Sequence, residues 1–149
     1  MKFTLSFLCS LLIVVSTFAQ KKQTVPVLTA NKKAVIDDIQ NQSSKLTEIS
    51  DKIWAAEETA FNETQSAKLL ADYAEANGFK VERGVADIPT AFVATYGSGS
   101  PVIGILGEFD ALPGLSQNKV PTKSPLHEGM PGHGCGHNLF GTASLGAAV

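Results

Sequence analysis

Apolar side chains recur at helical spacing through the first long stretch of the chain after its N-terminal leader. They are Val35, Ile36, Ile39, Leu46, Ile49, Ile53 and Trp54. The charged residues between them fall mainly on the opposite face, as in an amphipathic helix. The pattern predicts a long helix that has Asn31 as its N-cap and packs this apolar stripe into the core.

A second amphipathic segment covers residues 64–77. Its apolar face is formed by Leu69, Leu70, Tyr73 and Ala74. Asn77 and Gly78 stand at its end, and both residue types readily adopt the left-handed conformation that terminates helices. We therefore expect a second helix that stops at this pair.

Alternation of apolar and polar residues replaces the helical period after Gly78. Residues 79–82 and 90–96 are predicted as strands, and a glycine-rich turn at 97–101 precedes a continuously apolar run at 102–107. Such a turn joins antiparallel neighbours, so we expect 102–107 to pair with 90–96. Its uninterrupted apolar character is typical of a strand that is covered on both faces.

Acidic residues, Glu108 and Asp110, follow that apolar run directly. Sheets of α/β proteins place their sites at the carboxyl ends of buried strands. Residues 115–130 form a polar connection that is long for a loop without structure of its own, as functional loops often are. A helix rich in small residues begins at Leu139. The order of these elements predicts an α/β domain.

Residues 1–20 resemble a secretory signal peptide, in which a lysine precedes a short apolar run that ends in the small residue Ala19. The run is too short to span a membrane comfortably. An N-terminal membrane anchor is the alternative. We expect residues 1–20 to be removed, residues 21–30 to form a linker, and the protein to be exported to the periplasm or secreted.

The chain of 149 residues carries a formal net charge of -2 at pH 7 and has no basic run interleaved with aromatic residues. This charge gives no electrostatic reason to expect nucleic acid or an anionic membrane as a partner. After signal removal we expect no stable membrane association. Of the 2 cysteines, Cys9 lies in the leader, so the mature chain keeps the Cys135 thiol and no internal disulfide.

Cys135 and His137 stand one glycine apart in a glycine-rich segment at 131–138. Thiolate and imidazole are preferred ligands of zinc-like divalent metals. In an extended backbone alternate side chains point the same way, so both could face one ion or two neighbouring ions. The alternative is a glycine-rich turn with a buried cysteine and a hydrogen-bonded histidine. Spacing alone does not decide, because one Cys-x-His pair is weaker evidence than a four-ligand spacing.

Three nearby residues have more than one interpretation. Asp110 is either a surface carboxylate that caps a turn or the carboxylate that orients a metal-bound imidazole. Glu108 is similarly ambiguous, and His133 is a ligand, a substrate-binding donor or a loop residue. A nucleophilic mechanism with Cys135 and His137 is a weaker alternative, since residues two apart rarely align as nucleophile and base.

Residues 107–114, Gly-Glu-Phe-Asp-Ala-Leu-Pro-Gly, and 131–139, Pro-Gly-His-Gly-Cys-Gly-His-Asn-Leu, resemble the amidohydrolase branch of the aminoacylase/carboxypeptidase G metallopeptidase family. The resemblance covers residues 31–149. It implies the N-terminal portion of a mixed-sheet, helix-flanked catalytic domain that binds two divalent ions, zinc or manganese. A smaller inserted domain used for dimerisation is implied as well, and hence a homo- or hetero-oligomer at full length.

The same resemblance implies the chemistry and the roles of the site residues. The reaction would be hydrolysis of an amide in N-acyl amino acids or short peptides, with aminobenzoyl-glutamate-like substrates. Cys135 and His137 would be metal ligands, and Asp110 would orient a ligand histidine. Glu108 stands where carboxypeptidase-type relatives place a metal-binding histidine, so that ligand is replaced. Asn138 stands where many members of the branch have Asp.

The general base of the family is a glutamate in a Glu-Glu segment further along, and this chain has no such segment there. Glu57 and Glu58 lie far upstream, and we do not assign the role to them. We therefore expect the chain to be an N-terminal fragment of a longer enzyme, inactive alone. The alternative is a truncated, non-catalytic module that binds metal or a partner.

Overall fold

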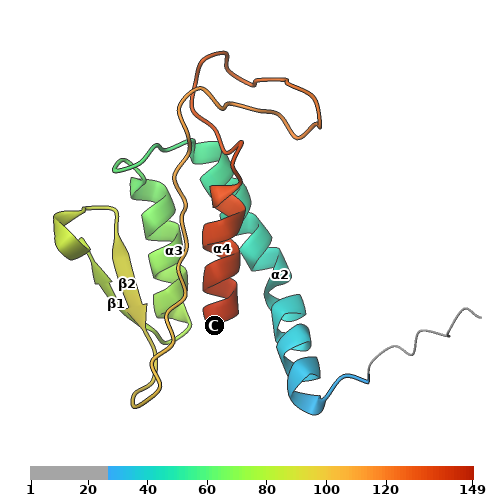
Figure 1. Cartoon of the computed structure of the whole chain (residues 1–149), viewed down its shortest axis with the longest axis vertical. Helices are drawn as coiled ribbons and strands as arrows, with labels where there is room; N and C mark the ends of the chain where they lie inside the picture. The colour runs from blue at the N-terminus through green and yellow to red at the C-terminus, as the bar shows by residue number, and fades with distance from the viewer. Residues whose placement is uncertain (1–26) are drawn as a thin grey trace, which may run out of the picture. The chain divides into compact units, whose positions relative to one another are not determined.

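The computed structural model describes residues 27–149, in the order α2, α3, β1, η2, β2 and α4 (Figure 1). The chain divides into two units, residues 1–33 and 34–149. The predicted signal peptide and most of the predicted linker lie outside the described residues. Among residues 27–149, no helix has the length and apolar character needed to cross a membrane.

The first predicted helix is confirmed as α2, Ala30–Ala56. Its N-cap is different from the prediction, because Thr29 rather than Asn31 precedes the first turn. The backbone N–H of Lys32 donates to the hydroxyl of Thr29 at 3.4 Å. This bond satisfies one of the donors that a helix start leaves without an intrahelical partner.

Only the C-terminal half of the apolar stripe on α2 is packed. Ile49 and Ile53 are buried and meet Leu70 and Tyr73 of the next helix in the core. The side chains of the N-terminal half, in contrast, are exposed: Val35, Ile36 and Ile39. The prediction that the whole stripe is core is therefore wrong for its first half, where no described element covers the helix.

The second predicted helix is confirmed as α3, Thr64–Ala76. It is followed by its C-cap, Asn77, and by Gly78, which has positive φ. Its first turn is capped from a distance by Glu58, whose carboxylate accepts the backbone N–H groups of Gln65 and Ser66, each at 2.9 Å. Burial raises the pKa of Glu58, but these bonds and those from neighbouring hydroxyls outweigh it and hold the pKa below its ordinary value.

The strands β1, Lys80–Arg83, and β2, Phe92–Thr95, form an antiparallel sheet of two strands with Lys80 opposite Thr95. A single turn of 3-10 helix, η2 at Val85–Asp87, lies in their connection. The hairpin packs on α3 (Figure 1). Helices with a small sheet are compatible with the α/β class, and the first two predicted strands are confirmed.

The third predicted strand, at 102–107, is not formed in the described part of the chain. Val102 is 88% exposed and Ile103 80% exposed, so the prediction of a strand covered on both faces is wrong here. A strand needs a neighbour for its backbone hydrogen bonds, and β2 pairs with β1 instead. The segment runs extended beside α4, where the Ser144 hydroxyl donates to the Leu106 carbonyl at 2.6 Å (Figure 1).

The last helix, α4, covers His137–Ala148 and begins at His137 rather than Leu139. Its small residues allow a close approach to the segment that carries the acidic residues. A Cβ atom placed on Gly141 would lie 2.7 Å from the carbonyl oxygen of Glu108. Gly141 therefore sets how closely the start of α4 lies against Glu108.

Candidate functional site

Backbone hydrogen bonds on two sides hold the chain next to Asp110. The N–H of Ala111 donates to the carbonyl of Glu58 at 2.7 Å, which ties the segment to the α2–α3 connection. Leu112 and Gly132 exchange backbone bonds of 3.0 and 3.1 Å, which tie it to the glycine-rich segment. The two motifs identified in the sequence, at 107–114 and 131–139, are thus joined directly.

His137 is the first residue of α4 and follows Gly136, which adopts the left-handed conformation with φ 80°. Its imidazole lies between two carboxylates. The Nδ1 atom is 2.8 Å from Oδ1 of Asp110, and the Nε2 atom is 3.1 Å from Oε2 of Glu108. The His137 side chain is 16% exposed and that of Asp110 is 21% exposed, whereas that of Glu108 is 51% exposed. The outer edge of the ring therefore opens toward solvent beside Glu108.

This arrangement suits a cation beside His137. If Nδ1–H is donated to Asp110 and Nε2 carries no proton, the lone pair of Nε2 faces the Glu108 carboxylate. Two ligand atoms that bind one metal at about 2.1 Å lie about 3.0–3.4 Å apart, and the Nε2 to Oε2 distance is 3.1 Å. Both atoms donate electron pairs, so a positive ion between them would satisfy both.

Cys135 lies in a turn, in which the N–H of Gly136 donates to the carbonyl of His133 at 2.9 Å. The extended backbone expected between Cys135 and His137 is therefore wrong. The Cys135 thiol is free and exposed. Within residues 27–149, no group of three or more His, Cys, Asp and Glu side chains stands close enough to hold a metal ion.

His133 is buried, with 9% of its surface exposed, and does not share the opening beside His137. Its Nε2 atom lies 3.0 Å from the carbonyl oxygen of Ile53 near the end of α2. Burial lowers the pKa of His133, and the hydrogen bond to Ile53 offsets this only in part. The Nδ1 atom is buried without a hydrogen-bond partner in the described structure.

The sequence did not point to the contact between Asn138 and Ser50. The Nδ2 group of Asn138 donates to the Ser50 hydroxyl at 3.0 Å, and both residues are buried. A clue is present on α2, since Ser50 is a polar residue beside Ile49 and Ile53 in the apolar stripe. A buried polar side chain needs a partner, but the sequence does not indicate which one.

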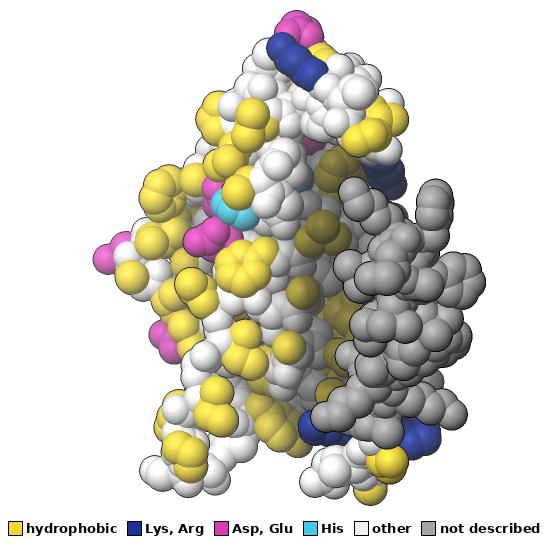
Figure 2. Space-filling view, turned by 45° about the vertical axis from the view of Figure 1, so that its right-hand side comes forward, with side chains coloured by type: hydrophobic (Ala, Val, Ile, Leu, Met, Phe, Trp, Pro, Cys, Tyr) yellow, Lys and Arg dark blue, Asp and Glu magenta, His cyan; other side chains and the backbone are white. Residues whose placement is uncertain are grey.

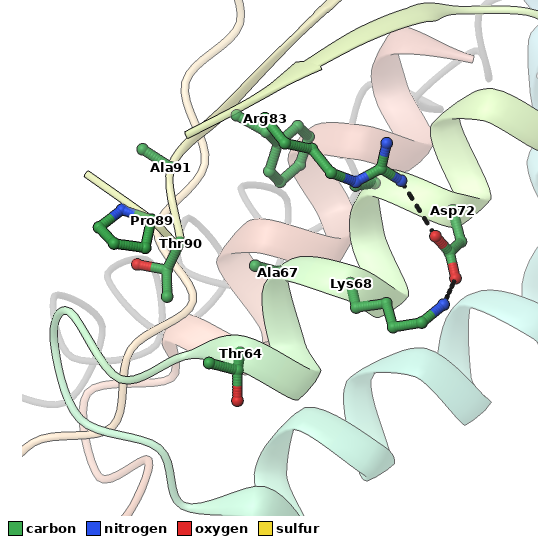
Figure 3. Close-up of a pocket in the computed structure, with 10 residues that line it drawn as sticks. Thr64, Ala67, Lys68, Asp72, Arg83, Pro89, Thr90 and Ala91 are labelled. Atoms are coloured by element: carbon green, nitrogen blue, oxygen red, sulfur yellow. Dashed lines mark hydrogen bonds and ion pairs between the residues drawn. The ribbon is translucent and has the colours of Figure 1, made fainter. Parts of the chain in front are cut away.

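A pocket of about 440 Å³ lies elsewhere, between α3 and the end of the connection that leads from β1 into β2 (Figure 3). Of its charged lining residues, Asp72 forms ion pairs with both Lys68 and Arg83. None of the site residues predicted from the sequence lines it. The pocket is therefore separate from the site around His137.

Exposed apolar side chains are spread over the face drawn in Figure 2, where histidine and acidic side chains also meet at the surface. Leu139 and Phe140, in the first turn of α4, are among the exposed apolar residues. His127, in the polar loop, is exposed as well. The first turn of α4, which begins with His137, thus exposes apolar side chains.

No model of a known protein family matches the chain. Over 116 residues it is 49% identical to a p-aminobenzoyl-glutamate hydrolase subunit of Escherichia coli, in a match that covers 76% of this chain and 24% of that protein. Over 114 residues it is 30% identical to thermostable carboxypeptidase 2 of Saccharolobus solfataricus, in a match that covers 75% of this chain and 28% of that protein. Thermostable carboxypeptidase 1 of the same organism is 29% identical over 114 residues. The chain spans about a quarter of the length of these curated relatives.

Proposed function

The chain is related to the amidohydrolases and peptidases represented by the p-aminobenzoyl-glutamate hydrolase and the two carboxypeptidases, and on this premise we propose that the site around His137 is part of a metal-dependent amide hydrolase. The substrate would be an N-acyl amino acid or a short peptide, with aminobenzoyl-glutamate-like compounds as the first candidates. The activity is that of the whole protein, of which residues 27–149 would supply one part.

The observation that carries this proposal is the position of His137 between Asp110 and Glu108. A metal-binding histidine usually donates its other ring N–H to a carboxylate, which fixes the tautomer and the direction of the ring. Asp110, 2.8 Å from Nδ1, is placed for this role. Nε2 of His137 would then be a ligand atom, and Glu108 would lie beside the same ion.

Cys135 would be the second ligand. Its thiol is exposed on the turn that leads into α4, and the positive end of a helix dipole favours a thiolate close to it. The described donor set fits a divalent ion in part, because it offers a thiol, an imidazole and a carboxylate but no closed group of three. We propose that the remaining ligands of two zinc or manganese ions come from the rest of the whole protein.

When bound, divalent ions supply Lewis acidity to the amide carbonyl and lower the pKa of a bound water. The residues of this chain would orient the site and present its ligands. Asp110 holds the Nδ1 proton of His137, and the exposed side of the ring stays open to an incoming amide. Glu58 is occupied as the cap of α3, so it is not free to act as the general base.

The test is hydrolysis by the whole protein of p-aminobenzoyl-glutamate and of N-acetyl amino acids, measured as amine released with and without added zinc or manganese. We expect turnover that a chelator removes and that the added metal restores. His137→Gln should abolish it, whereas the exposed His127→Gln should not. Metal-independent turnover, or full activity of His137→Gln, would contradict the proposal.

The non-catalytic alternative is supported by the incomplete donor set of the described residues. It predicts that the whole protein binds zinc or manganese but releases no amine from any amide tested. A Cys-dependent hydrolase is a further alternative, and it predicts inhibition by alkylating agents but not by chelators. The same assay therefore separates the three hypotheses.

A further inference from the structure

Two buried polar side chains attach the segment that carries Cys135 and His137 to α2. His133 precedes the pair and Asn138 follows it, and they are only 9% and 7% exposed. Each makes a hydrogen bond with α2, across 80 residues of sequence for His133 and 88 for Asn138. Buried polar groups are costly unless they are paired, so these contacts specify where the segment lies.

The bond from His133 has a defined direction. A carbonyl oxygen only accepts hydrogen bonds, so the Nε2 atom that lies 3.0 Å from the Ile53 oxygen must carry the proton. α2 ends at Ala56, so the carbonyl of Ile53 is among the last of the helix, which lack a complete set of intrahelical donors. His133 therefore supplies a donor that the helix end needs.

Asn138 makes the second attachment close by. Its Nδ2 group donates to the Ser50 hydroxyl at 3.0 Å. Ser50 and Ile53 are separated by about one helical turn, so both bonds reach the same side of α2. The segment from the turn at 133–136 to the first residue of α4 is thus attached to α2 at both ends.

The other half of the site depends on the same end of α2. The Ala111 N–H donates to the carbonyl of Glu58, which lies just beyond the last residue of α2. Asp110 is therefore held next to the residues that follow α2, and His137 is held next to the last turns of α2. The 2.8 Å distance between Asp110 and His137 depends on both attachments.

We propose that His133 is a positioning residue of this site, which holds His137 against Asp110 by donating its Nε2–H to the Ile53 carbonyl at the end of α2, with Asn138 and Ser50 as the second attachment. The metal affinity of the Cys135 and His137 pair then depends on α2, although no side chain of α2 is a ligand. The inference rests on the proposed metal site.

Two substitutions distinguish the roles of the two ring nitrogen atoms of His133. His133→Gln places an amide donor near the position of Nε2 and keeps the bond to Ile53. His133→Asn places polar atoms near Nδ1 but is too short to reach the carbonyl. If His133 positions the site through Nε2, His133→Gln should keep the metal affinity and His133→Asn should not. If Nδ1 has the role, the two variants should behave in the reverse way. If the ring itself has the role, both variants should lose affinity equally.

The first measurement is the affinity of the whole protein for Co²⁺, by spectroscopic titration. We expect His133→Asn to bind Co²⁺ about 10–100-fold more weakly than the wild type, as when a residue that orients a metal ligand is substituted. The affinity of His133→Gln should stay within a factor of about three of the wild type. Wild-type affinity in His133→Asn would overturn the inference, and so would equal weakening in both variants. Circular dichroism confirms that each variant is folded.

The second measurement needs no metal. The Nδ1–H proton of His137, hydrogen-bonded to Asp110, is followed by nitrogen-15 NMR in the metal-free protein. We expect its resonance to be retained in His133→Gln and shifted or lost in His133→Asn, and identical spectra would overturn the inference. If the wild type binds no Co²⁺, the proposed function fails while this readout still decides the role of His133.

Ser50→Ala is the variant to use if His133→Asn does not fold. Alanine is favoured in helices, and the substitution removes the hydroxyl that accepts from Asn138 at 3.0 Å while the Ser50 carbonyl, at 3.4 Å, remains. We expect the same His137 resonance to shift in this variant. An unchanged resonance and an unchanged Co²⁺ affinity would overturn the part of the inference that assigns positioning to the bond between Asn138 and Ser50.

Discussion

The Oδ1 atom of Asp110 lies 2.8 Å from the Nδ1 atom of His137, although 27 residues separate them in the sequence. The long polar loop at 115–130 lies between Asp110 and His137 in the sequence. Backbone hydrogen bonds between Leu112 and Gly132 join the two ends of that loop. The close packing of Gly141 on Glu108 places the start of α4 beside the segment that carries Asp110. This one distance therefore depends on several elements at once.

Replacement of Asp110 by Asn should weaken metal binding more than folding. The amide removes the charge and the assured acceptor for Nδ1–H, so the His137 ring is no longer held in one tautomer. We expect metal affinity to fall about 10–100-fold. Competition with a zinc indicator measures it in the whole protein.

Asp87→Asn is the matched control for that substitution. Asp87 is exposed in η2 and has positive φ, a conformation that Asn tolerates. Its zinc affinity should equal that of the wild type. An equal fall in both variants, or none in Asp110→Asn, would show that Asp110 does not act through His137.

Glu58→Gln should lower stability at neutral pH but not in acid. The folded protein holds the pKa of Glu58 below its ordinary value, so its carboxylate contributes stability above the unfolded pKa of about 4.3. That contribution is lost as the pH falls through the folded value. The loss at pH 7 should be about 1 kcal/mol, as for other helix caps.

Urea unfolding at pH 7 and at pH 3 measures the effect of Glu58→Gln. The difference from the wild type should shrink toward zero as Glu58 itself becomes protonated. Glu82→Gln, at an exposed position in β1, should change stability little at either pH. A difference for Glu58→Gln that stays constant with pH would argue against the charged cap.

Gly141→Ala should destabilise the protein, although alanine is normally favoured over glycine in a helix by about 1 kcal/mol. The added Cβ would lie 2.7 Å from the Glu108 carbonyl oxygen, which is backbone and cannot move aside freely. The net loss should be about 1–3 kcal/mol, as in other overpacked sites. Thermal unfolding measures it.

Gly104→Ala is the comparison for Gly141→Ala. A Cβ at Gly104 meets nothing within 4 Å, so its thermal midpoint should stay near that of the wild type. Stabilisation by Gly141→Ala would mean that α4 does not approach Glu108 as closely as described.

Ile49→Ala and Val35→Ala should have very different effects, although both residues belong to the same apolar stripe of α2. Ile49 is 1% exposed and Val35 is 64% exposed. We expect a loss of about 2–5 kcal/mol for Ile49→Ala because it leaves a cavity, and a change within about 0.5 kcal/mol for Val35→Ala. Similar losses in denaturant unfolding would show that the whole stripe is packed.

The helices and the first two strands could be predicted because their patterns are local, whereas the pairing of β1 with β2 was not predicted. Periodicity identifies α2 and α3, and alternation identifies β1 and β2. The same reasoning failed at 102–107, because an apolar run shows that a segment can be buried but does not supply the neighbours that bury it. Val102 and Ile103 remain exposed for this reason.

The candidate site was only partly predictable. The resemblance pointed to Asp110 and His137, and the structure brings these two side chains together. The cap formed by Glu58 and the contact of Ser50 with Asn138 could not be predicted, since each joins residues whose proximity depends on tertiary folding. The roles of Cys135 and His137 as ligands stay predictions.

The absorption spectrum of the Co²⁺-loaded whole protein tests the central claim most directly. If Cys135 and His137 are ligands, the wild type should show a thiolate-to-cobalt charge-transfer band in the near ultraviolet. Cys135→Ser should lose that band, and His137→Gln should bind Co²⁺ far more weakly. A wild type that shows no such band at saturating Co²⁺, or a band that persists in Cys135→Ser, would contradict the account.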